Sequence, residues 1–234
     1  MSELAVALAG DDGTVRDAVE AVGGAVVPAA EADALVTLGE AALVDAALSE
    51  PAVPLLAVGA DGGLHSVSSR EVGRALDALE AGSVRRTSHD VLSVAVGGER
   101  VARGLLDVSL MTDGPAHISE YSVRAGGDEI DRFRADGVVV ATPAGSSGYA
   151  RAAGGPVLGP GAGLSVVPVS AFETNPDTWV LDDDVGLVVE RDDSAIDLVV
   201  DGSVVASVPV RTPVEVVPDG SVDLLRVPKV ASSG

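Results

Sequence analysis

The order of apolar and polar positions divides the chain into two parts of different character. In the first part, short apolar runs alternate with stretches of helical periodicity. We expect strands at 4–8, 25–27, 34–38 and 55–58, and helices at 14–22, 40–48 and 68–79. Strands that alternate with helices form a parallel sheet with helices packed on its faces. Residues 1–82 are therefore predicted to form a small doubly wound α/β domain.

After Gly82 the pattern changes to apolar runs that are separated by glycine-containing turns. We expect strands at 91–96, 100–111, 117–123, 164–169, 179–181, 187–190, 196–200 and 204–208. An Asp-Gly pair, Asp201 and Gly202, lies between the last two runs and is a strong hairpin signal. Residues 83–234 are therefore predicted to form a β-rich domain, so that the fold class is two-domain α+β.

The composition is compatible with a large core that contains few aromatic rings. Hydrophobic residues make up 47% of the 234 positions and aromatic residues 2%, so Val, Ala and Leu must build the core, with Trp179 and Phe172 filling its sparse aromatic part. The chain has no cysteine, which excludes disulfides and thiolate metal sites. His65, His89 and His117 lack metal-ligand spacing, so we expect them at the surface or in turns and expect no metal site. With no bilayer-length apolar run and no basic signal-peptide start, the protein is expected to be soluble and cytoplasmic.

The charge balance is strongly acidic. Asp and Glu total 36 against 15 Lys and Arg, for a net charge of −21, and Lys229 is the single lysine. Such a surface repels itself unless salt screens it, which is typical of proteins from the salt-loaded cytoplasm of extreme halophiles. No basic patch is present, so nucleic acid and anionic membranes are not expected as partners.

The most distinctive segment, residues 142–149, reads TPAGSSGY and directly follows a valine-rich run at 138–140. Glycine lets backbone N–H groups approach a ligand closely, and Ser and Thr hydroxyls donate to phosphate or ribose oxygens. Tyr149 offers a flat face for a purine or nicotinamide ring. This arrangement indicates a nucleotide site, and an ordinary Gly/Ser-rich connection is the alternative.

Residues 136–156, DGVVVATPAGSSGYARAAGGP, resemble the signature of the NAD kinase family, which usually reads DG…STPTGSTAY…AGGP. The resemblance implies an N-terminal α/β domain and a C-terminal β domain with the nucleotide in the cleft between them. It implies ATP-dependent phosphorylation of the 2′-hydroxyl of NAD, with NAD and Mg-ATP as ligands. A dinucleotide is therefore the expected partner, and we also expect a homo-oligomer. The residues that the resemblance assigns to ligand binding are Asp107, Asp136, Thr142, Gly145, Ser146, Ser147 and Tyr149.

The chain departs from the family pattern where a carboxylate is needed to take the proton of the hydroxyl. The family carries a Gly-Gly-Asp-Gly-Thr turn after a strand of its first domain, but here the run at 34–38 leads into Gly39, Glu40, Ala41 and Ala42. The aspartate position is thus Ala41 or Ala42, and Glu40 and Asp107 are the candidate replacements.

Two further segments bear on this departure. Residues 10–14, GDDGT, look like the missing turn but follow the first strand. We interpret them as a helix start with acidic caps, and a displaced phosphate loop with Asp11 or Asp12 as the base is the alternative. Leu106 stands before Asp107 where the family usually has Asn, which removes one polar anchor for NAD.

Two main hypotheses follow from the resemblance and these departures. In the first, the protein is an active NAD kinase that uses a substitute carboxylate. In the second, it is a non-catalytic NAD(P)-binding relative, or a regulatory or assembly partner of an active paralogue. A kinase that acts on another hydroxyl substrate is a weaker third possibility.

Overall fold

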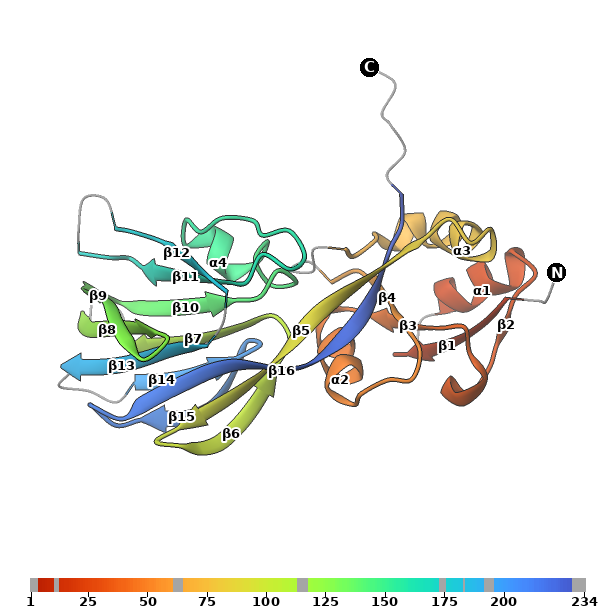
Figure 1. The fold of residues 1–234 in the computed structure, drawn as a ribbon. Coiled ribbons are helices and arrows are strands. Elements are labelled where there is room, and N and C mark those ends of the chain that lie inside the picture. The colour runs from red at the N-terminus through yellow and green to blue at the C-terminus, as the bar shows by residue number, and fades with distance from the viewer. Residues whose placement is uncertain are drawn as a thin grey trace, which may run out of the picture. The chain divides into compact units, whose positions relative to one another are not determined.

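The computed structural model describes residues 4–10, 13–60, 65–112, 118–172, 176–182, 184–191 and 196–228. The chain divides into two compact units, one formed by residues 1–88 with 222–234 and the other by residues 89–221. The pattern of apolar positions predicts this boundary after residue 82, with the C-terminal residues in the second domain. Two long strands, β5 (Arg85–Val96) and β16 (Pro213–Arg226), run from one unit into the other (Figure 1).

The first unit contains a parallel sheet with the strand order β2-β1-β3-β4. These strands are β1 (Ala5–Ala9), β2 (Ala25–Val26), β3 (Ala34–Leu38) and β4 (Leu55–Val58). The helices are α1 (Gly13–Ala21), α2 (Glu40–Leu48) and α3 (Val72–Glu80), with short 3₁₀ turns η1 (Ala29–Glu31) and η2 (Ser69–Glu71). The end of β16 extends the sheet, because Leu224 pairs in parallel with Leu55 of β4. The predicted α/β unit is confirmed.

Helix positions in this unit follow from apolar spacing and from one cap. Val15 and Val19 of α1 lie four residues apart on one helical face and are fully buried, together with Leu76 of α3. The turn before α3 is closed by a capping box in which Ser68 and Glu71 bond reciprocally. The capping box therefore gives hydrogen-bond acceptors to two backbone N–H groups at the point where the chain enters the helical segment.

The second unit contains antiparallel strands in two sheets. One includes the path β13-β8-β9, with the first part of β16 beside β13 and the hairpin β5–β6 beside β16. The other has the order β12-β11-β10-β7-β14-β15. The remaining bounds are β6 (Glu99–Gly104), β7 (Asp107–Thr112), β8 (Ser119–Ala125), β9 (Asp128–Ala135), β10 (Gly137–Ala141), α4 (Tyr149–Ala152), β11 (Leu164–Val169), β12 (Trp179–Leu181), β13 (Val185–Arg191), β14 (Ile196–Val200) and β15 (Ser203–Val208).

Alternation along β10 assigns its residues to two different apolar clusters. Val138 and Val140 belong to the main core of the unit, which also contains Tyr121 and Phe133. Val139 points to the opposite side of the strand, into a smaller cluster that also contains Ala150 of α4. All five residues of β10 are buried, which explains why its sequence is a continuous apolar run.

Several expectations about single residues and elements in this unit are wrong. The run at 100–111 is not one strand, because it breaks into β6 and β7 around Leu105 and Leu106. His89 is buried, with 2% of its surface exposed, whereas Phe172 is 69% exposed instead of lying in the core. Trp179 does pack against the core and stacks on Phe133 with ring centroids 6.0 Å apart. His117 lies outside the described residues.

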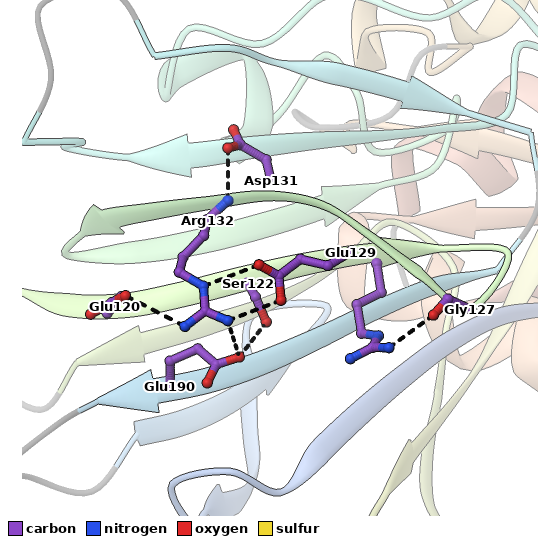
Figure 2. A network of polar contacts seen from close by, with 8 residues as sticks. Glu120, Ser122, Gly127, Glu129, Asp131, Arg132 and Glu190 are labelled. Carbon is purple, nitrogen blue, oxygen red and sulfur yellow. Dashed lines mark hydrogen bonds and ion pairs between the residues drawn. The ribbon is translucent and has the colours of Figure 1, made fainter.

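A network of ion pairs joins β8, β9 and β13 (Figure 2). The guanidinium of Arg132 lies 3.0 Å from a carboxylate oxygen of Glu129, 3.3 Å from Glu190 and 3.7 Å from Glu120. The hydroxyl of Ser122 also donates to Glu190 at 2.8 Å. One arginine thus compensates three carboxylates on the surface of an acidic protein.

Candidate functional site

The segment at 142–148 connects β10 to α4, and buried hydrogen bonds of Thr142 hold it in place. The Thr142 side chain is fully buried, and its Oγ1 lies 2.7 Å from the carbonyl oxygen of Leu105 and 3.1 Å from that of Leu106. The same oxygen accepts the N–H of Gly145 at 3.2 Å. Thr142 therefore ties the turn both to itself and to the break between β6 and β7.

Gly145 and Ser146 also lie inside the turn, where they contact other parts of the protein. A Cβ at Gly145 would overlap the carbonyl group of Leu106, so a glycine is required for this close backbone approach. Ser146 is fully buried, donates to the carbonyl oxygen of Pro143 at 3.0 Å and accepts the N–H of Leu158 at 2.9 Å. Among the hydroxyl residues of the turn, only Ser147 is partly exposed.

Tyr149, the first residue of α4, lies where Asp107 and Asp136 both act on it. Its hydroxyl is 3.7 Å from the Sδ of Met111, and 43% of the residue is exposed. Partial burial raises the pKa of Tyr149 above its usual value, and the negative charges of Asp107 and then Asp136 raise it further. Three of the predicted site residues, which come from separate segments, are thus linked electrostatically.

The register of β7 and β10 fixes where the two aspartates lie along the sheet. In this antiparallel pair Asp107 lies opposite Ala141, and Met111 lies opposite Gly137, the residue after Asp136. The two aspartates are therefore carried at opposite ends of the strand pair, with the Met111–Tyr149 contact near the Asp136 end. Gly137 leaves room for Met111, because a Cβ there would overlap the Met111 sulfur.

Helix α4 is seated on this sheet face by small apolar residues (Figure 1). Ala150 packs against Val139, Val167 and Val169, and Ala153 lies at the edge of the same cluster. Ala150 is the buried residue of this four-residue helix, and its small side chain lets the helix lie close to the sheet, while Tyr149 at the first helical position stays partly exposed. The result is a partly exposed tyrosine whose hydroxyl contacts a thioether and on which the charges of two carboxylates act.

Asp201 belongs to this region although the sequence analysis assigns it only to a hairpin turn. Its carboxylate accepts the backbone N–H groups of Leu105 and Leu106 at 2.7 Å each and that of Asp107 at 3.1 Å. The only feature of the sequence that singles out Asp201 is the Asp-Gly pair. This pair predicts a turn, but it does not predict the contact of Asp201 with residues 105–107.

In the first unit, the positions that the family pattern assigns to a catalytic turn lie at the start of α2. Gly39 has a φ of 84° and precedes the helix, and Glu40, Ala41 and Ala42 form its first turn. The side chain of Glu40 is exposed. Asp11 and Asp12, the other candidate carboxylates, lie outside the described residues.

The described part of the chain offers neither a metal-binding cluster nor a membrane-spanning helix. Its His, Asp and Glu residues form no group of three or more that could hold a metal ion. Within the same residues, no helix is long and apolar enough to cross a membrane.

Comparison with known proteins gives matches to NAD kinases. A family profile for the ATP-NAD kinase C-terminal domain matches residues 105–220, a stretch that includes all the predicted ligand residues and Asp201. The NAD kinase of Methanopyrus kandleri is 31% identical over 208 residues, which cover 86% of this chain and 72% of that protein. The NAD kinase of Gemmatimonas aurantiaca is 34% identical over 185 residues, which cover 74% of this chain and 64% of that protein.

Two solved structures share the fold. Yeast NADH kinase in complex with NADH superposes with a TM-score of 0.75 at 16% identity, covering 97% of this chain and 84% of that one. An NAD kinase from Archaeoglobus fulgidus in complex with ATP gives a TM-score of 0.68 at 23% identity, covering 96% and 93%. The two-domain fold, with an α/β unit and a β-rich unit, is therefore the one found in these kinases.

Proposed function

The chain belongs to the NAD kinase family, and from this premise we propose that it binds NAD and phosphorylates its adenosine 2′-hydroxyl with ATP to give NADP. The observation that supports this proposal most directly is that the negative charges of Asp107 and Asp136 both act on Tyr149, the residue that follows the turn at 142–148. These residues come from three segments. Asp136 and Tyr149 match the family's signature by position, and Asp107 matches the acidic residue that follows the family's usual Asn.

In the proposed complex, the ring of Tyr149 stacks on a ring of the dinucleotide, because its face is partly exposed. The carboxylates of Asp107 and Asp136 accept hydrogen bonds from ribose hydroxyls or from an amide or amino group. Ser147 supplies a hydroxyl donor. Thr142, Gly145 and Ser146 act indirectly, by holding the turn in shape through the contacts described above.

The reaction forms a bond between the 2′-oxygen of NAD and the γ-phosphorus of ATP and breaks the bond from that phosphorus to the bridging oxygen of ADP. A carboxylate takes the proton of the 2′-hydroxyl, and Asp107 and Glu40 are the candidates. Phosphoryl transfer depends mainly on positioning and on charge stabilisation. Because Mg²⁺ commonly binds through substrate phosphates and one or two carboxylates, it enters as the Mg-ATP complex.

A second candidate is a relative that binds the dinucleotide without turnover. The observation in its favour lies at α2, where the helix begins directly after Gly39 and alanines occupy positions 41 and 42. A helix start with alanine side chains has no carboxylate at the positions expected for the catalytic aspartate. Loss of a positioned general base slows a reaction by about 10²–10⁴-fold.

One assay separates the two candidates. The purified protein is incubated in concentrated KCl with NAD, ATP and MgCl₂, and NADP is followed with an NADP-specific dehydrogenase, while NAD binding is measured by calorimetry. NAD binding together with NADP formation supports the kinase. The variant that loses NADP formation, Glu40→Gln or Asp107→Asn, then identifies the base, and Asp219→Asn is the surface control. Binding without turnover supports the second candidate, and absence of NAD binding contradicts both.

A further inference from the structure

A single carboxylate connects the β14–β15 hairpin to the segment that carries Asp107. The Oδ2 of Asp201 accepts the N–H of Leu105 at 2.7 Å, and its Oδ1 accepts the N–H groups of Leu106 at 2.7 Å and Asp107 at 3.1 Å. In return, the N–H of Asp201 donates to the carbonyl oxygen of Asp107 at 3.0 Å. Four hydrogen bonds thus join residues that lie 94 to 96 positions apart in the sequence.

The chemistry of this contact requires an aspartate. A carboxylate has acceptor sites on both oxygens and no donor, so it alone can satisfy three converging N–H groups, whereas an amide would direct its own N–H₂ at one of them. Bonds to an ionised acceptor are also stronger than neutral ones. The backbone supports the choice, because Asp201 has a φ of 46°, a region that Asp tolerates better than most side chains.

Gly104 provides the space for the carboxylate. A Cβ at this position would lie 2.7 Å from the Cγ1 of Val200 and 3.4 Å from the Oδ2 of Asp201. A side chain at 104 would therefore displace the hairpin that delivers Asp201.

The opposite edge of the same segment is held by Thr142. Its hydroxyl contacts the carbonyl oxygens of Leu105 and Leu106, and its N–H donates to Leu106 at 2.9 Å. The N–H groups are thus held by one hairpin and the carbonyl groups by the turn after β10. Asp107 follows directly, and its N–H and C=O groups are both bonded to Asp201. The negative charge of its carboxylate acts on Tyr149 and raises the pKa of that residue.

We infer that Asp201 is a positioning residue for dinucleotide binding, which acts by fixing the backbone of residues 105–107 so that the Asp107 carboxylate meets the ligand. This inference rests on the proposed function, in which Asp107 contacts NAD. The competing explanation is that Asp201 only stabilises the hairpin, in which case its removal lowers stability but has no specific connection to Asp107.

A double-mutant cycle distinguishes these explanations, because residues that act as one unit are non-additive. The dissociation constant for NAD is measured for the unmodified protein, Asp201→Ala, Asp107→Asn and the double variant, with Asp201→Asn as a milder replacement. Asp219→Asn is the matched control, since it removes an exposed carboxylate that pairs with Arg100 at 2.7 Å in the same unit. Circular dichroism and amide hydrogen exchange confirm that each variant is folded.

We expect Asp201→Ala to weaken NAD binding by about tenfold or more, the range that corresponds to lost hydrogen bonds to a charged group. Asp201→Asn has a smaller effect, because it keeps one acceptor, and Asp219→Asn has none. In the Asp107→Asn background, Asp201→Ala changes binding by less than about twofold, well below one tenfold step. If Asp201→Ala does not fold, Asp201→Asn alone and in the Asp107→Asn background provides the same comparison.

Other outcomes overturn the inference in distinguishable ways. Folded Asp201 variants that bind NAD like the unmodified protein show that the hairpin contact does not position the site. Equal weakening with and without the Asp107 carboxylate shows a stabilising role only. Failure of the unmodified protein to bind NAD overturns the proposed function, and this inference with it.

Discussion

The hydroxyl of Thr142 at the end of β10 donates a 2.7 Å hydrogen bond to the carbonyl oxygen of Leu105 at the break between β6 and β7. Both groups are buried, and 37 residues separate them. The bond therefore fixes the distance between the turn at 142–148 and the segment that leads into Asp107. In this chain the threonine at 142 therefore stabilises the turn through buried hydrogen bonds within the protein.

We expect Thr142→Val to destabilise the protein by about 1–3 kcal/mol, because it leaves a buried carbonyl oxygen without its donor at nearly unchanged side-chain volume. Thr142→Ser retains the hydroxyl, so we expect it to lose much less stability. Denaturant unfolding in concentrated KCl measures both. Equal stability of the valine and serine variants would show that the hydroxyl contributes nothing.

Gly145→Ala is expected to cost about 1–3 kcal/mol or more, since the added methyl group meets the backbone of Leu106 and neither segment is free to move away. Gly159→Ala is the matched control. It lies in the loop that follows α4, has no atom within 4 Å of an added Cβ and has no positive φ. Thermal unfolding of the two variants side by side tests the close approach, and similar midpoints would contradict it.

The buried strands and the order of the elements were predictable from the sequence, because apolar runs such as 138–140 and 34–38 are long enough to identify strands. Strand β9 was not, since its polar residues lie on a sheet edge and only Phe133 and Ala135 are buried. An edge strand with one solvated side lacks the continuous apolar signal of a central strand.

Side-chain direction in the turn was also beyond the sequence. Whether Ser146 or Ser147 points inward depends on Leu158, whose N–H the Ser146 hydroxyl accepts from twelve residues away. The role of Asp201 likewise depends on backbone groups that local sequence does not specify. The pattern at 142–149 therefore predicts a ligand site without separating residues that could face a ligand from residues that hold the turn in shape.

The charge environment of Tyr149 predicts a shift that can be measured by absorbance. In a Tyr121→Phe background, Tyr149 is the remaining tyrosine of the two in the chain. Since the Asp107 charge disfavours the phenolate, Asp107→Asn should lower the pKa of Tyr149 towards the usual value of about 10. Asp136→Asn should lower this pKa by a smaller amount. A titration curve that is unchanged in Asp107→Asn would show that the Asp107 carboxylate does not act on Tyr149.

The ion-pair network around Arg132 predicts a salt-dependent and pH-dependent contribution to stability. Arg132→Gln leaves Glu120, Glu129 and Glu190 uncompensated, so the unfolding midpoint should fall more at low salt than at high salt. Arg100→Gln, which breaks one exposed pair with Asp219, is the control, and its unfolding midpoint should fall less.

The same network fixes the direction of its pH dependence. The hydrogen bond from Arg132 lowers the pKa of Glu129, so the folded state holds this carboxylate ionised more strongly than the unfolded chain does. The stabilising contribution is therefore present above the unfolded value of about 4.3 and is lost as the pH falls through the lower folded value. Acid unfolding of Arg132→Gln should lack this contribution, and coincident acid transitions would contradict it.

The last prediction concerns the salt that the whole protein needs. A net charge of −21 on 234 residues gives strong self-repulsion once screening is removed, and the Debye length grows to ~30 Å at about 0.01 M salt. We expect the midpoint of thermal unfolding to fall steadily between molar and millimolar KCl. Sucrose at matched osmolarity is the control, because it stabilises folded proteins without screening charge. Circular dichroism and unfolding midpoints that do not change across this range would show that the acidic surface does not depend on salt.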